Sequence, residues 1–180
     1  MKLGLVAELM QDGQVEANLA RVFTRLEENK GQGYDLLCFG ESFLQGFEGL
    51  TWDYQADHAI AISQDGPIIQ RLQIQVRHCQ TAVSFGYIEK AGEKLYSSNL
   101  LLSKDGEIVD NFRRVSVGWK EPIVNADERY AEGDGFHAFE FGGKTLTTAI
   151  CGDLWHDHFL EAISQVPSDL IGSVKYFSHI

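Results

Sequence analysis

The pattern of the first forty residues constrains the fold more than any other feature of the chain. Residues 2–9 (KLGLVAEL) form an apolar run bounded by polar turn residues, which predicts a strand. Residues 34–40 (YDLLCFG) form a continuous apolar run, typical of a strand buried on both faces. Between the two runs, apolar residues recur at helical spacing on one face: Val15, Leu19, Val22, Phe23 and Leu26. A strand, a helix and a buried strand in this order predict a parallel unit with a right-handed crossover.

The rest of the chain mixes further strands and helices. Residues 66–79 predict a second helix, with Pro67 in its first turn. Another helix is expected to follow Cys151 and to run to Pro167. Further strands are expected at 81–89, 97–103, 106–112, 137–141, 144–150 and 168–171, the last interrupted by Gly172. A long irregular stretch at roughly 113–136 separates them, and loops of this length are usually functional. The order predicts an α/β or α+β layered domain.

The charge balance argues against nucleic acid and anionic membranes as partners. The chain has 26 acidic and 15 basic residues, a formal net charge of −11, whereas phosphate binding needs a basic patch. No stretch approaches the ~18 apolar residues that span a membrane, and the N-terminus lacks the apolar core of a signal peptide. Three cysteines without metal-ligand spacing suit a reducing compartment. We therefore expect a cytoplasmic protein.

Cys151 is the strongest candidate for a nucleophile. It follows the apolar run TLTTAI and precedes a polar turn, and a turn between a strand and a helix exposes a side chain at the carboxyl edge of a sheet. The backbone N–H groups at such a turn favour a thiolate and supply a site for an oxyanion. Cys38 lies inside a predicted strand and Cys79 on a predicted helix, so both are expected to be structural.

Two other polar segments lie where they could join the same site. Glu41 directly follows the apolar run LLCFG, where burial can raise the pKa of a carboxyl group and where the group can face a pocket. Arg113, Arg114, Lys120 and Glu121 lie at the start of the long irregular stretch, where cations and a carboxylate could surround a reacting carbonyl. Taken alone, either segment could equally be a solvated loop with charged residues and no catalytic role.

Three segments together resemble the signatures of the nitrilase superfamily, the carbon–nitrogen hydrolases. They are residues 39–43 (FGESF) followed by Gly46, residues 112–114 (FRR) and residues 150–155 (ICGDLW). Residues 130–134 (YAEGD) also resemble the segment that precedes the hairpin leading to the cysteine of that family. The resemblance spans residues 1–171 and implies a four-layer α-β-β-α sandwich.

The resemblance also implies a catalytic set. Glu41 would be the general base, and Cys151 would attack a carbonyl or nitrile carbon to form a thioester. A cation would stabilise the oxyanion together with the backbone N–H of Gly152. The lysine of the family is replaced here by Arg114, which cannot give up a proton as a lysine can. Either Arg114 fills this position or Lys120 reaches into the site instead.

The resemblance implies one further acidic residue, and three other residues lie beside the cysteine. A second glutamate in the long loop would be Glu121 or, failing that, Glu128. Trp155 would line the substrate site or pack under the turn at the cysteine. His156 and His158 could suggest a metal pair, but their spacing at a helix start is expected to point them in different directions. The family needs no metal, so we expect neither metal nor cofactor.

The implied activity is hydrolysis of a non-peptide carbon–nitrogen bond in a small molecule, an amide rather than a nitrile, by a homodimer or larger homo-oligomer. One alternative is a catalytically impaired, truncated relative that acts as a binding or interaction module. Another is an unrelated α/β thiol enzyme that does not need Glu41. The chain stops at Ile180, so we expect residues 1–171 to form a partial domain with exposed apolar strand edges, followed by an atypical tail at 172–180.

Overall fold

A parallel strand–helix–strand unit opens the chain, as its apolar pattern predicts. The computed structural model describes residues 1–120 and 126–174. In it β1 (Leu3–Leu5) pairs in parallel with β2 (Leu36–Cys38), and α1 (Val15–Asn29) connects the two strands. The apolar face expected for α1 is buried, since Leu19, Val22 and Leu26 have no exposed surface.

The first sheet continues from this unit with two antiparallel hairpins. β3 (Ala82–Ala91) pairs in parallel with β2 and antiparallel with β4 (Lys94–Leu102), which pairs antiparallel with β5 (Ile108–Arg113). The short strand β6 (Tyr130–Ala131) pairs in parallel with the first residues of β4. The three successive strands expected from the sequence, β3, β4 and β5, are therefore confirmed, together with the hairpins that join them. The sheet has the order β1-β2-β3-β4-β5.

The second sheet holds the strand that leads to Cys151. β7 (Ala138–Phe141) and β8 (Lys144–Ile150) form the predicted hairpin, and β9 (Leu170–Val174) pairs in parallel with β8. The expectation that Gly172 interrupts the last strand is wrong, because Gly172 pairs with Thr148 within a continuous parallel ladder. β9 carries exposed apolar side chains at Leu170 and Ile171.

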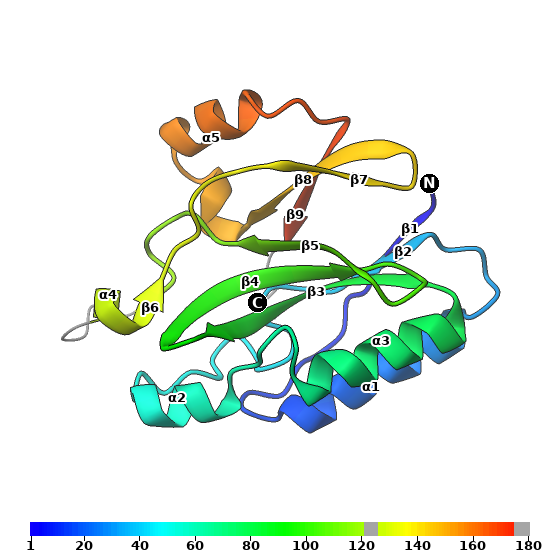
Figure 1. Ribbon diagram of the computed structural model, residues 1–180, viewed down its shortest axis with the longest axis horizontal. Coiled ribbons are helices and arrows are strands. Elements are labelled where there is room, and N and C mark those ends of the chain that lie inside the picture. The colour runs from blue at the N-terminus through cyan, green and yellow to red at the C-terminus, as the bar shows by residue number, and fades with distance from the viewer. Residues whose placement is uncertain (121–125, 175–180) are drawn as a thin grey trace.

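The elements stack in four layers (Figure 1). α1 and α3 (Pro67–Cys79) cover one face of the first sheet, the second sheet lies over its other face, and α5 (Asp157–Ser164) lies beyond the second sheet. The core under α1 and α3 includes Val83, Phe85 and Tyr87 of β3. Between the sheets, Ala82 and Leu101 belong to a cluster with two phenylalanines of β7. The α-β-β-α arrangement is thus confirmed.

Three short helical elements depart from the predicted pattern. α2 (Tyr54–Ile60) was not expected, although Asp53 caps it by accepting a hydrogen bond from the Ala56 N–H over 3.0 Å. α4 (Ala126–Arg129) lies inside the stretch expected to be irregular. The chain after β8 first makes a 3-10 turn, η1 (Cys151–Leu154), before α5 begins. No helix in the described part of the chain is long and apolar enough to cross a membrane.

Candidate active site

Cys151 stands at a strained turn. It is the first residue of η1 and directly follows β8, so its partly exposed side chain lies at the carboxyl end of that strand. Its φ is 43°, in the left-handed region that residues other than glycine rarely adopt. Strain of this kind is retained where the surrounding structure over-determines it, and it is concentrated at functional sites.

Glu41 and Arg114 form a buried ion pair beside this turn. Glu41 follows β2, and Arg114 follows β5, which places both after strands of the first sheet. Arg114 Nη1 donates a hydrogen bond to Glu41 Oε1 over 3.1 Å. The two side chains are 7% and 3% exposed, so the charges face each other with little water between them.

Burial raises the pKa of Glu41 above the usual value for a glutamate. The charge of Arg114 and hydrogen bonds from Cys151 and Arg114 oppose this effect, and the charge of Asp153 adds to it. Oε2 of Glu41 is buried and accepts no hydrogen bond of normal geometry from the described residues. The Cys151 side chain also interacts with this carboxylate, so a thiol and a carboxylate lie together at the turn.

Two glycines allow these groups to approach. A Cβ atom on Gly152 would overlap Arg114 Nη2, so the guanidinium group lies against the backbone next to the nucleophile. A Cβ atom on Gly86, in the middle of β3, would overlap the backbone of Gly40, Glu41 and Ser42. Gly86 was not singled out from the sequence, although a glycine inside a strand often marks a close backbone approach.

Asp153 and Ser116 connect the turn at Cys151 to Arg114. Asp153 is fully buried and accepts hydrogen bonds from the backbone N–H groups of Val115, Ser116 and Ile150, over 3.1, 2.7 and 2.8 Å. Ser116 Oγ accepts a hydrogen bond from Arg114 Nε over 2.8 Å. Neither role was inferred from the sequence, because Asp153 acts on backbone groups that no side-chain pattern reveals.

Lys120 binds a different carboxylate. Its Nζ lies 2.9 Å from Glu132 Oε1 and donates a hydrogen bond to the Tyr130 carbonyl oxygen over 2.8 Å. Of the two cations that the sequence left open, Arg114 is therefore the one that the structure pairs with Glu41. Lys120 lies beside an aromatic cluster in which Trp52 and Trp119 pack against the Tyr130 ring.

A buried carboxylate joins the two loops that carry these aromatic residues. Asp57 accepts hydrogen bonds from Tyr130 Oη over 2.7 Å, from the Trp52 N–H over 3.0 Å and from both the N–H and hydroxyl groups of Thr51. The loop after Glu41 and the loop after Arg114 are thereby fixed to each other.

The remaining predicted residues lie as follows. Glu121 lies outside the described residues, and Glu128 is exposed on α4. Trp155 is 66% exposed, so it does not pack under the turn. The expectation that His156 and His158 point in different directions is wrong, because their rings stack with centroids 5.7 Å apart. His156 is extended and precedes α5, so helical spacing does not apply to the pair. The described residues hold no cluster of three or more potential metal ligands.

Of the other two cysteines, Cys79 is buried and Cys38 is partly buried. Burial raises the pKa of Cys38 to about 11 and also raises the pKa of Cys79. Both thiols are therefore poor nucleophiles near neutral pH, which agrees with the structural role expected for them.

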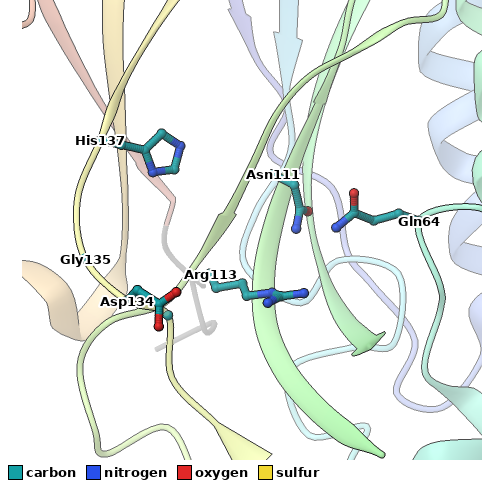
Figure 2. A pocket seen from close by; sticks show the side chains of 7 residues that line it. Gln64, Asn111, Arg113, Asp134, Gly135 and His137 are labelled. Carbon is teal, nitrogen blue, oxygen red and sulfur yellow. The ribbon is translucent and has the colours of Figure 1, made fainter. Parts of the chain in front are cut away.

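A separate cavity of about 250 Å³ lies beside β5 (Figure 2). Arg113, Asn111, Gln64 and His137 are among the residues that line it. Three of its polar side chains are already paired, since Arg113, Asn111 and Gln64 bind Glu89. This cavity contains neither Cys151 nor Glu41.

Comparison with known proteins finds matches to both the sequence and the fold. Residues 6–171 match the carbon-nitrogen hydrolase family. An (R)-stereoselective amidase from Pseudomonas sp. is 28% identical over 171 residues, which cover 95% of this chain and 58% of the amidase. An arylacetonitrilase from Hypocrea virens is 26% identical over 167 residues, which cover 89% of this chain and 42% of that enzyme.

Solved structures show the same fold. An amidase from Nesterenkonia sp. superposes with a TM-score of 0.77 at 16% identity, over 99% of this chain and 66% of the amidase. The match spans 58% of the length of the (R)-stereoselective amidase and between 24% and 42% of the other curated relatives reported by the comparison.

Proposed function

Because this chain belongs to the carbon-nitrogen hydrolase family, we propose that it hydrolyses a non-peptide carbon–nitrogen bond of a small amide. The observation that carries the proposal is the buried Arg114–Glu41 pair beside the strained turn at Cys151. Together, Cys151, Glu41 and Arg114 would supply a nucleophile, a general base and a cation at one place.

The first half of the reaction forms an acyl-enzyme. Glu41 takes the thiol proton of Cys151 as the sulfur attacks the amide carbon, and the carbonyl oxygen becomes an oxyanion. The protonated Glu41 then gives that proton to the nitrogen, the carbon–nitrogen bond breaks, and ammonia or an amine leaves. A raised pKa suits Glu41 for both steps, because a base with a pKa nearer neutrality exchanges protons more readily.

The second half consumes one water. Glu41 removes a proton from water as its oxygen attacks the thioester carbon. Collapse of the second tetrahedral intermediate breaks the carbon–sulfur bond, and the proton held on Glu41 restores the thiol of Cys151. The products are a carboxylic acid and the unmodified enzyme.

Arg114 would stabilise both oxyanions. Its Nη2 lies against the backbone of Gly152, the residue that follows the nucleophile, so a negative charge on an oxygen beside this residue would meet a guanidinium group. Arg114 does not exchange protons, so it contributes only electrostatic stabilisation and hydrogen bonds. This favours amides over nitriles, because a nitrile develops negative charge on a nitrogen that must be protonated.

The experiment measures ammonia release from a panel of small amides and the matching nitriles, with hydroxylamine added to trap the acyl group as a hydroxamate. Amides should yield ammonia and hydroxamate, Cys151→Ala should abolish both, and the control Cys38→Ala should keep both. Turnover of nitriles without turnover of amides would contradict the amide assignment and identify nitriles as the substrate class. No product from any substrate, with Cys151 still alkylated by iodoacetamide, would favour the binding or interaction module.

A cytoplasmic location and a homo-oligomer remain predictions. The exposed Leu170 and Ile171 side chains of β9 are compatible with contact to another chain. Sedimentation of the purified chain measures its oligomeric state, and a monomer at micromolar concentration would contradict the second expectation.

A further inference from the structure

Asp153 connects two segments that meet only through the fold. One of its carboxylate oxygens accepts the N–H groups of Val115 and Ser116, which follow Arg114, and the other accepts the N–H group of Ile150, which precedes Cys151. A fully buried carboxylate that is satisfied by three backbone N–H groups holds those groups at fixed positions. Asp153 therefore fixes the segment that carries the cation to the turn that carries the nucleophile.

Ser116 extends this connection to the guanidinium group. Its N–H binds Asp153, and its hydroxyl oxygen accepts the Nε–H of Arg114. With Nε on Ser116 and Nη1 on Glu41, the plane of the guanidinium group is set, and Nη2 lies against Gly152. A long side chain with many rotamers is thereby held in one orientation.

We infer that Asp153 and Ser116 are positioning residues that align Arg114 with Cys151 for the reaction. The inference rests on the proposed function for its effect on turnover. It also explains how an arginine works in this position, because only an arginine has the Nε–H that Ser116 accepts, and a lysine has no such group.

Asp153 has a second effect, on Glu41. The groups that act on the Glu41 carboxylate are Arg114, Cys151 and Asp153, and the negative charge of Asp153 favours the protonated form of Glu41. Replacing Asp153 by a neutral residue should therefore lower the pKa of Glu41.

The first test compares Asp153→Asn with Asp157→Asn, which removes the same charge from an exposed residue at the start of α5. The measurement is the rate of Cys151 alkylation by iodoacetamide as a function of pH, read by peptide mass. Because Asp153 holds both the turn at Cys151 and the segment that follows Arg114, Asp153→Asn should displace the acid limb of this profile, and Asp157→Asn should not. Identical profiles for the two variants would overturn the role of Asp153.

The second test uses Ser116, whose replacement is milder for folding. Ser116→Ala should lower kcat by about 10- to 100-fold through misalignment, with little change in KM, while Ser116→Thr, which keeps the hydroxyl, should restore it. In an Arg114→Lys background Ser116→Ala should have no further effect, since lysine lacks the Nε–H. An equal loss of kcat in both backgrounds would overturn the positioning role of Ser116.

The two tests separate this inference from the proposed function. If the wild-type chain hydrolyses no amide, the proposed function fails, yet the alkylation profile of Asp153→Asn still decides the role of Asp153. If Asp153→Asn does not fold, the kcat of the Ser116 variants decides instead.

Discussion

Arg114 Nη1 lies 3.1 Å from Glu41 Oε1, although the two residues are 73 positions apart in the sequence. Each is carried to this point by the strand before it, β5 for Arg114 and β2 for Glu41. Removing one partner of a buried ion pair leaves an uncompensated charge, so the general base and the cation depend on each other.

Arg114→Met tests this dependence. The substitution keeps the bulk of the side chain and removes its charge, so kcat should fall by about 100- to 1,000-fold as oxyanion stabilisation is lost. Thermal unfolding should also show a loss of about 3 kcal/mol, because Glu41 stays buried without its partner. The control is Arg71→Met, since Arg71 forms an exposed ion pair with Glu16. Equal effects of the two substitutions would contradict the special role of Arg114.

Gly152→Ala should displace the guanidinium group. The added methyl group would overlap Arg114 Nη2, which cannot move freely because Ser116 and Glu41 hold the other nitrogens. We expect kcat to fall by at least about 10-fold, because small displacements of aligned groups are costly. Gly172→Ala, in β9, is the matched control, since its methyl group would meet its nearest neighbour at an ordinary 3.8 Å. Retained turnover in Gly152→Ala would show that the site tolerates another arginine position.

Cys151→Gly and Cys151→Ala test the strain at the nucleophile. Because φ is positive at this position, we expect the glycine variant to be the more stable of the two, by about 1 kcal/mol in chemical denaturation. At Cys38, within β2, the order should be reversed, since glycine in a strand is less stable than alanine by about 0.5–1 kcal/mol. The same order at both positions would argue against strain at Cys151.

We expect Glu89→Gln to lower the stability of the fold by an amount that depends on pH. Glu89 is fully buried on β3, and burial alone would raise its pKa. Side-chain hydrogen bonds outweigh this and lower the pKa below its usual value. The donors are Arg113, Ser98, Asn111 and Gln64.

The sign of the pH effect follows from the lowered pKa of Glu89. The ionised carboxylate stabilises the fold above its unfolded pKa of about 4.3, and this contribution is lost as the pH falls through the lower folded value. At pH 7, Glu89→Gln should cost about 3 kcal/mol, and the difference from wild type should shrink below about pH 4. Glu16→Gln, at the surface, should cost less than about 0.5 kcal/mol at any pH. A cost for Glu89→Gln that does not change with pH would contradict this account.

The layered fold could be predicted because its signals are local. The helical spacing from Val15 to Leu26 and the apolar run at 34–40 each report burial on a known face. The weaker elements had no such signal. α2 is only seven residues long, too short for a repeated apolar spacing, and β9 continues through Gly172 because of its pairing with β8 rather than its own sequence.

The candidate site could be predicted only in part, for a related reason. Glu41, Arg114 and Cys151 each follow a strand end, which the apolar pattern locates. The choice between Arg114 and Lys120 depended on side-chain contacts between distant segments, which only the fold defines. Asp153 was missed because its partners are backbone N–H groups, and these are present at every residue except proline.

The most direct test of the proposed site is the mass of the intact chain, quenched in acid during turnover of a small amide. We predict that the wild-type chain gains the mass of the acyl group, that peptide mapping places it on Cys151, and that hydroxylamine removes it. Cys151→Ala should show no adduct. Ammonia release from an amide without any adduct, or an adduct on Cys38 or Cys79 instead, would contradict the assignment of Cys151 as the nucleophile.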